Sequence, residues 1–151
     1  MRVPLLVAGA GLTPRTEPAL ALNIDLAPTL LELAGRPAST PMHGRSLALL
    51  IRNAQTAWRE VFIYECLEGY GGTRPMLGAM TVDWSLIQTW ATRTDVATAA
   101  APFSELYHRG SDRAEARNVA TLPANAAIRA RLEREIARHI EKIRPVAVVG
   151  R

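Results

Sequence analysis

The chain has 151 residues, of which 48% are hydrophobic and 21% are charged. This length suits one domain, or one domain with a small subdomain, and it is enough to bury a sizeable core. No apolar run approaches the about 18 residues that a membrane-spanning helix needs, so we expect no membrane segment. The single cysteine, Cys66, excludes an internal disulfide framework.

The net charge of +4 comes from 18 basic and 14 acidic residues, and Lys142 is the one lysine. The arginines are spread along the chain. Where they are densest, in residues 129–141, they alternate with glutamates, a pattern typical of a solvated helix face with local ion pairs. No zinc-ligand spacing or RNA-binding motif accompanies them. We therefore expect no nucleic-acid partner and keep an arginine-rich nucleic-acid-binding protein as the weaker alternative.

The first apolar segment, Val3–Val7, predicts a short strand of the buried type. Pro4 removes one backbone donor, which favours a position near a sheet edge or at the start of the strand. The same segment is a poor match to a signal peptide, because its apolar stretch is short and interrupted by Pro4. We expect a core strand and no signal peptide, and the localisation stays open.

The segment Asp25–Ala34 predicts a short amphipathic helix. Asp25 can cap its start by accepting a hydrogen bond from a free backbone N–H. Pro28 falls in the first turn, where its missing N–H costs little, and Gly35 can take the left-handed conformation that ends a helix. One face of this helix is apolar. It carries Leu26, Leu30 and Leu33.

The middle of the chain predicts a short helix, a loop and several antiparallel strands. Alternating apolar residues bounded by turn residues favour strands, and a hairpin turning near Asp83 is expected. The alanine-rich segment 92–102 is expected to be irregular. The predicted elements are a helix at Ser46–Asn53, strands at Val61–Glu65, Met80–Val82, Trp84–Trp90 and Phe103–Tyr107, and a loop at Glu68–Pro75.

The last predicted element is a helix with one apolar stripe. Its apolar residues recur every fourth position, which places them on one helix face, and Pro145 is expected to stop it. We expect this face to pack against the antiparallel sheet. The stripe consists of Ile128, Leu132, Ile136 and Ile140.

Several segments resemble one known family in the order in which they occur. Asn23–Gly35, which reads N-I-D-L-A-P-T-L-L-E-L-A-G, closely resembles the segment after the last core strand of the type I sulfatases, members of the alkaline-phosphatase-like superfamily. Arg2–Gly9 resembles the strand that opens "R-V-P-L-I-V" in this family, and Met42–Leu47 is similar to its "G-R-S-L" turn. Arg59–Glu65 resembles the first strand of the small C-terminal subdomain, and Glu105–Tyr107 begins the closing stretch.

The resemblance implies an α/β fragment. Residues 1–57 would be the C-terminal remnant of the sulfatase α/β core, with its last strand and helix. Residues 58–151 would be a small antiparallel α+β subdomain with a packed C-terminal helix. The branch that this chain resembles has an N-sulphoglucosamine sulphohydrolase-type C-terminal region.

The catalytic groups that the resemblance implies are missing from this sequence. Sulfatases of this type need a cysteine or serine in a C/S-x-P/A-x-R motif, which is converted to formylglycine, and aspartates that bind calcium. The one cysteine, Cys66, is followed by Leu67-Glu68-Gly69-Tyr70 and lacks the proline and arginine of that motif. We therefore expect no catalytic residue, metal ligand or cofactor in this chain. Calcium and formylglycine are implied only for a complete enzyme.

The resemblance places four residues at the edge of a substrate pocket, namely Glu65, Glu68, Tyr70 and Arg74. They occupy a strand end and a glycine-rich loop, and arginine suits bidentate sulfate or carboxylate recognition. A surface loop with no binding role is the other interpretation. The three histidines share no metal-ligand spacing. His43 is expected in a loop and His139 on the solvated side of the last helix, while His108 stands where the family has an aspartate.

The sequence thus predicts a C-terminal part of a sulfatase, an enzyme class that hydrolyses sulfate esters or sulfamates, and predicts that it is inactive alone. Its partners would be a catalytic sulfatase segment, or a second copy held through an exposed core face. The alternative is a non-catalytic domain that binds a partner through that face. Some departures weaken the resemblance: Met80 and Ser85 replace basic residues in the hairpin, and Asp112-Arg113 replaces an Asp-Pro turn.

Overall fold

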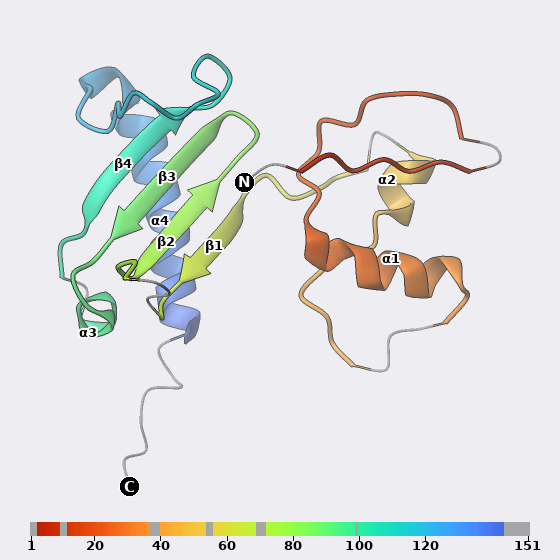
Figure 1. Cartoon of the computed structure of the whole chain (residues 1–151), viewed down its shortest axis with the longest axis horizontal. Helices are drawn as coiled ribbons and strands as arrows, with labels where there is room; N and C mark the ends of the chain where they lie inside the picture. The colour runs from red at the N-terminus through yellow and green to blue at the C-terminus, as the bar shows by residue number, and fades with distance from the viewer. Residues whose placement is uncertain are drawn as a thin grey trace, which may run out of the picture. The chain divides into compact units, whose positions relative to one another are not determined.

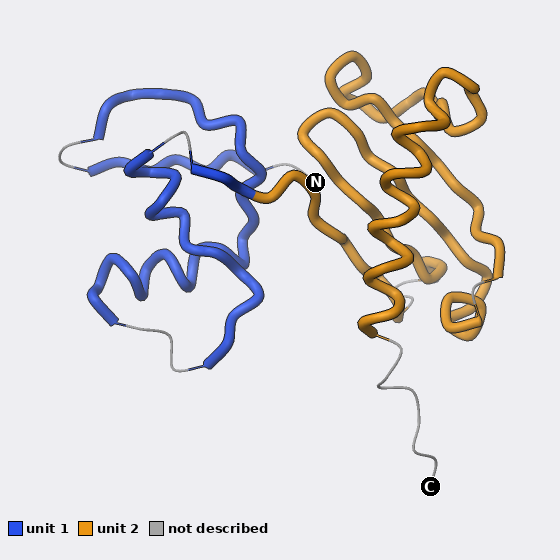
Figure 2. The backbone as a smooth tube through the Cα atoms, turned by 180° about the vertical axis from the view of Figure 1, so that it is seen from behind, with its two compact units in different colours: residues 1–58 blue, residues 59–151 orange. Residues whose placement is uncertain are grey.

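A computed structural model describes residues 3–9, 12–36, 40–53, 56–68, 72–98 and 100–143. The chain forms two compact units, residues 1–58 and residues 59–151 (Figure 2). None of the helices in the described ranges combines the length and apolarity needed to cross a bilayer.

The first unit is built around two short helices (Figure 1). A 3-10 turn at Asn23–Asp25 leads into α1, Leu26–Leu33, and α2 spans Ala48–Arg52. Both helices were expected from the sequence. The end of α1 is a Schellman motif, in which Gly35 has φ +66° and donates to Glu32 O, while Arg36 donates to Leu31 O. Gly35 therefore ends the helix as predicted, because glycine takes this conformation without a Cβ penalty.

Asp25 was predicted to cap the start of α1, but its carboxylate caps the start of the preceding 3-10 turn instead. Its backbone is already helical, because the chain enters α1 through the 3-10 turn, and its side chain caps no N–H of α1. The carboxylate instead accepts the N–H of Leu22 at 2.8 Å and the N–H of Arg45 at 2.8 Å. Asp25 is fully buried, so these hydrogen bonds replace the water that its charge would otherwise bind.

The side chains of Asp25 and Thr29 fasten the turn at residues 44–47 to the start of α1. Thr29 Oγ1 donates to Asp25 O at 2.6 Å and accepts the N–H of Leu47 at 2.8 Å. The two segments approach so closely that a Cβ on Gly44 would lie 1.9 Å from Ile24 O. Only glycine fits at this position without moving the backbone. Arg45 then stacks on the ring of Trp58 at 4.7 Å.

The strand predicted at Val3–Val7 does not form. These residues make no strand pairing, and Leu6 is 92% exposed. A parallel-type strand needs neighbouring strands to satisfy its backbone and helices to cover its faces, and the described residues supply neither. An open hollow of about 730 Å³ lies between residues 5–21 and α2, lined in part by Leu5, Leu12 and Leu50.

The second unit is a four-stranded antiparallel sheet with one covering helix (Figure 1). Its strands lie in sequence order and each pairs with the next in the chain. Helix α4, Ala126–Ile143, packs on one face of the sheet. The strands are β1, Phe62–Cys66; β2, Met76–Met80; β3, Trp84–Thr89; and β4, Phe103–His108.

The core of this unit lies between the sheet and α4. Leu132 and Ile136 of α4 are fully buried against the sheet, and Ile128 and Ile140 pack around them. The stripe predicted for the terminal helix is therefore its core face. The sheet contributes residues that alternate along the strands, as one face of a pleated sheet requires. They include Leu77, Ala79, Leu86 and Leu106.

The ends of β1, β3 and β4 differ from the predicted ends by one residue, and two larger differences occur in this unit. Strand β2 begins at Met76, four residues before the predicted start at Met80, because its backbone pairs with β1 over its whole length. A short helix, α3, spans Arg93–Ala97 in the segment expected to be irregular. Thr92 and Asp95 cap its start reciprocally, at 3.2 Å and 2.8 Å. A capping box is a sequence signal for a helix start, and it was missed because the segment was judged by its alanine-rich composition.

The segment between β4 and α4 forms its turn without the family's proline. Asp112 accepts the N–H of Arg117 at 2.9 Å and of Ala116 at 3.2 Å, and these bonds lower the pKa of its carboxyl. Glu115 takes a positive φ of 52° there. A 3-10 turn at Pro123–Asn125 then starts α4. Pro145, which was expected to stop α4, lies outside the described residues.

Candidate functional site

The candidate site is the end of the sheet at which β1 and β3 finish and β2 and β4 begin. The antiparallel register brings these four strand ends together, because Cys66 pairs with Met76, Met76 with Thr89 and Thr89 with Phe103. Phe103, the first residue of β4, is 66% exposed at this end of the sheet. Connecting segments at such strand ends carry side chains that a sheet positions but does not bury.

Glu68 follows β1 at this end and is paired with Arg93. The carboxylate Oε1 lies 2.7 Å from Arg93 Nη1, and the two side chains are 86% and 64% exposed. Arg93 is the first residue of α3, so the capping box at Thr92 fixes the backbone that presents it. The sequence did not single out Arg93, because nothing local indicates a contact across 25 residues.

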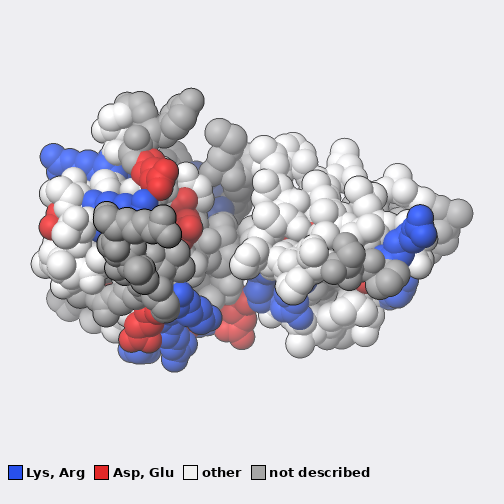
Figure 3. Space-filling model, turned by 90° about the horizontal axis from the view of Figure 1, so that it is seen from below, with Lys and Arg blue, Asp and Glu red and all other residues white. Residues whose placement is uncertain are grey.

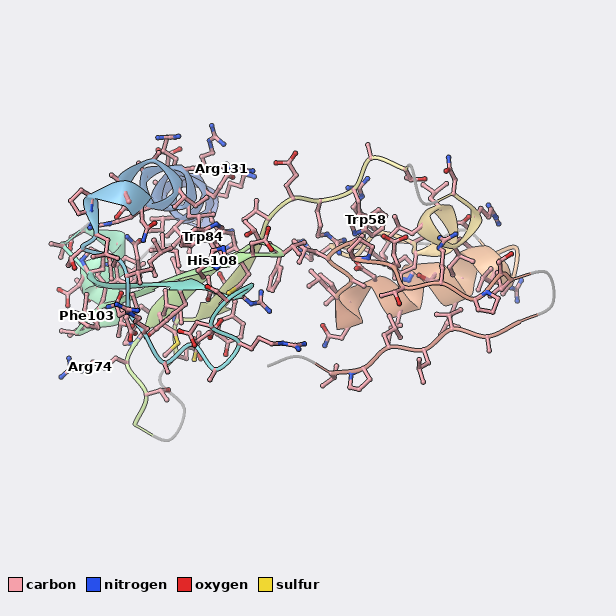
Figure 4. The ribbon with its side chains drawn as sticks, turned by 90° about the horizontal axis from the view of Figure 1, so that it is seen from above. Trp58, Arg74, Trp84, Phe103, His108 and Arg131 are labelled. Atoms are coloured by element: carbon pink, nitrogen blue, oxygen red, sulfur yellow. The ribbon has the colours of Figure 1, made fainter. Side chains whose placement is uncertain are left out.

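Arg74 stands just before β2 and extends from the sheet end (Figure 4). It is exposed, and it forms no ion pair with any residue in the described ranges. A guanidinium in this state presents its planar fork of N–H donors to solvent. Tyr70, the third predicted residue of the pocket edge, lies outside the described residues.

Glu65 is held by a different helix. It shares the α4 face of the sheet with Leu77, its partner across the strands, and its Oε2 lies 2.7 Å from Nε2 of His139. His139 was expected on a solvated helix face, but its side chain is only 28% exposed. Tertiary packing explains this difference, because α4 crosses β1 at this residue. Glu65 and Glu68 are thus tied to separate helices.

The sheet face opposite α4 carries a hydrogen-bonded pair of acidic groups. The Tyr107 O–H donates to Glu105 Oε1 at 2.6 Å. This bond, together with burial and the nearby carboxylates, raises the pKa of Tyr107 to about 12. The phenol therefore stays protonated at neutral pH. This pair ties two residues of β4 together.

The described residues contain no group of three or more histidine, cysteine or acidic side chains that could hold a metal ion. His43 is exposed in its loop. His108 accepts the N–H of Ser111 at 3.2 Å, and its ring meets Trp84 edge-on at 4.6 Å (Figure 4). Cys66 is half-buried and is the free thiol of this chain.

Charges on the second unit are interspersed. Figure 3 shows basic and acidic side chains next to one another on the face that it draws. On α4, Arg129 pairs with Glu133 at 2.8 Å and Arg138 pairs with Glu135 at 2.7 Å. Four of the alternating charges of this helix therefore form local ion pairs, as the sequence predicted, while Arg131 pairs with Glu60 outside the helix.

A family model described as "N-sulphoglucosamine sulphohydrolase, C-terminal" matches residues 1–142. The chain belongs to this family of sulfatase C-terminal regions. The match covers both compact units, so the order of motifs noted in the sequence reflects common descent with other members of this family.

Curated sulfatases are similar to part of this chain. Human N-acetylglucosamine-6-sulfatase is 43% identical over 68 residues, which is 43% of this chain and 12% of that protein. The extracellular sulfatase SULF-1 homolog of Drosophila melanogaster is 36% identical over 70 residues, or 6% of that protein. The chain therefore spans only a small share of the curated relatives that it matches.

Solved structures share the fold. A protein solved in complex with its substrate D-glucosamine-2-N,6-O-disulfate superposes on this chain with a TM-score of 0.67 at 22% identity. The match covers 85% of this chain and 26% of that protein chain. A protein assigned as a sulfatase from Bacteroides thetaiotaomicron gives 0.63 at 24% identity, covering 78% and 24%. The phosphonate monoester hydrolase of Agrobacterium radiobacter gives 0.57 at 16% identity, covering 78% and 24%. This sulfatase C-terminal region thus has the fold of the corresponding part of much longer chains.

Proposed function

We propose that this chain is a C-terminal portion of a sulfatase that does not hydrolyse sulfate esters or sulfamates by itself. The observation that carries the proposal is the family match over residues 1–142 in a sequence that contains no C/S-x-P/A-x-R segment. The names of the relatives make sulfated glucosamine compounds the first substrates to consider for the complete enzyme.

The cofactors of a complete sulfatase do not fit the residues described here. Calcium takes six to eight oxygen ligands, usually from several carboxylates, and no cluster of three candidate ligands occurs in the described ranges. Cys66 lacks the proline and arginine that formylglycine formation requires. Both groups belong, in this proposal, to a catalytic segment outside these 151 residues.

The proposed contribution of this chain is one edge of the substrate pocket. Arg74 supports it most strongly, because its guanidinium is exposed and free of described ion pairs. Glu68 lies near the same strand end, and we also include Tyr70, which stands between Glu68 and Arg74 in the sequence. Glu65 contributes less, since its carboxylate is already bonded to His139.

The proposed partner is the catalytic segment of a sulfatase. The first unit exposes the apolar face of α1, where Leu30 is 66% and Leu33 is 59% exposed, and the unpaired Val3–Val7 segment. Large exposed apolar surfaces mark interaction sites or cause association. When the catalytic segment is absent, we expect a second copy of the chain to cover these surfaces. A non-catalytic partner-binding domain would use the same face.

Purified chain incubated with an aryl sulfate and calcium tests the proposal. We expect no turnover above a heat-denatured control, because neither the nucleophile nor the metal carboxylates are present to lower the barrier. Cys66→Ala is the matched variant, and it should be indistinguishable from the wild type. Turnover that scales with protein concentration and falls in Cys66→Ala would contradict the proposal.

A further inference from the structure

The two edges of the four-stranded sheet differ in how their backbone groups are satisfied. β4 forms one edge and β1 the other (Figure 1). The N–H of Leu106 in β4 donates to Asn118 Oδ1 at 3.0 Å, and Leu106 O accepts the N–H of Val119 at 2.8 Å. Ser104 O accepts a hydrogen bond from Asn118 Nδ2 at 3.4 Å. The segment that follows β4 therefore covers the middle of this edge.

The hydrogen bonds of β2 show which backbone groups of β1 face outward. Hydrogen-bonded and non-hydrogen-bonded pairs alternate along an antiparallel ladder. The N–H of Thr81 donates to Trp84 O at 2.8 Å, so the odd-numbered residues of β2 bond to β3. Its even-numbered residues therefore bond to the even-numbered residues of β1. The N–H and C=O groups of Ile63 and Glu65 consequently point away from β2.

The β1 edge lacks the features that usually keep an edge strand from pairing with another chain. Those features are prolines, bulges, exposed charges and covering segments. β1 reads F-I-Y-E-C and pairs with β2 without a break in register. Its one charged side chain, Glu65, is bonded to His139 of α4. Within the described residues, nothing bonds to the outward backbone groups of Ile63 and Glu65.

We propose that β1 pairs antiparallel with β1 of a second copy, so that two sheets become one continuous sheet with a two-fold axis at Tyr64. In this register Ile63 lies opposite Glu65 of the second copy, and all outward backbone groups of both residues gain partners. A shift by two residues in one direction would place Glu65 opposite itself, and like charges in that position are destabilising. A shift in the other direction would pair Glu65 with Val61, which lies outside β1.

The side chain at the proposed axis supports a second copy as the occupant of this edge. Tyr64 is 51% exposed and lies on the sheet face opposite α4. Because its backbone bonds to β2, the two Tyr64 residues of the dimer would form a non-hydrogen-bonded pair, in which side chains lie closest. Aromatic pairs across strands are stabilising. β1 is thus complementary to itself in hydrogen bonding, in charge and at the axis.

Analytical ultracentrifugation of the full chain tests the proposal. Leu30→Glu is included throughout, so that association through the apolar face of α1 does not mask the β1 contact. We expect a reversible dimer. Adding Tyr64→Lys should raise its Kd by about tenfold, because two opposed charges replace the aromatic pair. Phe103→Lys is the matched control, since Phe103 is 66% exposed on the same sheet face but in β4, and it should leave the Kd unchanged.

Cross-linking and hydrogen exchange report the register itself. In a Cys66→Ser background, Tyr64→Cys should form a disulfide between copies on mild oxidation, because directly opposed Cβ atoms lie within disulfide range. Phe103→Cys in the same background should not. The N–H groups of Ile63 and Glu65 should exchange more slowly as the protein concentration rises, whereas the N–H of Tyr64 should be protected at every concentration.

Three outcomes would overturn the proposal. The first is a monomer at every concentration tested. The second is a dimer that Tyr64→Lys does not weaken, or that Phe103→Lys weakens equally, because the contact would then lie elsewhere. The third is exchange at Ile63 and Glu65 that does not depend on concentration. If Tyr64→Lys fails to fold, as judged by circular dichroism, the exchange measurement without that change decides. None of these measurements needs turnover, so they are independent of the aryl sulfate assay.

Discussion

The two units of this chain bury their side chains in different ways. The second unit has a continuous core between α4 and the sheet, in which Leu77, Leu86 and Leu132 are fully buried. The first unit buries the polar side chains of Asp25 and Thr29 beside a small apolar group around Leu47. Most of the large apolar side chains that are exposed in the described ranges lie in the first unit.

The comparison shows that hydrogen bonds can fix the local backbone of a unit whose apolar surface is still partly exposed. Asp25 and Thr29 accept hydrogen bonds from the N–H groups of Arg45 and Leu47, yet the apolar face of α1 remains open to water. Because burial of apolar surface is the main favourable term in folding, we expect most of the stability of this chain to reside in the second unit. We expect the first unit to be the part of the chain that binds a partner.

The largest expected effect is in the core of the second unit. Leu132→Ala should lower the free energy of unfolding by about 2–5 kcal/mol, because it empties a fully buried position between α4 and the sheet. Arg131→Ala is the matched control on the same helix. It removes only the exposed ion pair with Glu60, whose removal should cost less than about 1 kcal/mol. Chemical denaturation followed by circular dichroism measures both, and equal losses would refute the assignment of the core.

A smaller loss of stability is expected when Asp25, a buried polar residue of the first unit, is replaced. Asp25→Ala leaves the N–H groups of Leu22 and Arg45 without their buried acceptor, which should cost about 1–3 kcal/mol. Hydrogen exchange should rise in residues 40–53 while the sheet stays protected. Asp25→Asn keeps one acceptor oxygen and should lie between Asp25→Ala and the wild type. A uniform rise across both units would show that they unfold together.

Alkaline pH should weaken the second unit through Tyr107. Its pKa is raised from 10.0 to about 12, so the folded state holds the phenol proton more tightly than the unfolded chain does. The resulting stability is present below pH 10 and is lost as the pH rises through 12. Thermal unfolding between pH 9 and 12 should therefore show a smaller decline in Tyr107→Phe than in the wild type. Tyr64→Phe, an exposed tyrosine on the same sheet face, should keep the wild-type decline.

The smallest effect on stability is expected at the exposed apolar face of α1. Leu30→Glu should change the free energy of unfolding by less than about 0.5 kcal/mol, yet it should reduce self-association. Light scattering and binding of a hydrophobic dye measure the association. Leu122→Glu, at an exposed leucine of the second unit, is the control and should leave both signals unchanged. If the wild type is already a monodisperse monomer, the open-face hypothesis is wrong.

Periodicity and end signals were enough to predict α1, α2, α4 and most of the sheet. The four-residue recurrence of Ile128, Leu132 and Ile136 predicted the packed face of α4, and Gly35 predicted the end of α1. Val3–Val7 has the composition of a strand but forms none, because strand formation depends on neighbours that composition does not supply. Helix α3 was missed because its alanine-rich surroundings hid the capping box at Thr92.

The candidate site was less predictable than the fold. The family resemblance and residue type pointed to Glu68 and Arg74, which follow β1 and precede β2 at the same end of the sheet. The partner of Glu68 could not be inferred, because Arg93 reaches it across 25 residues of chain. Likewise, the position of His139 depends on where α4 crosses β1, which the sequence pattern does not specify.

Gly44 packs directly against the backbone of Ile24. We therefore expect the sequence motifs around these two residues to be inherited together. The Cβ of any other residue would collide with the carbonyl of Ile24, and Asp25 holds the neighbouring Arg45 N–H across 20 residues. A chimera that joins two family members between residues 25 and 44 would take the two contacting segments from different proteins. Their close backbone contact would then not be preserved. Gene shuffling within this family should therefore tolerate crossovers before residue 22 or after residue 47 better than any between them.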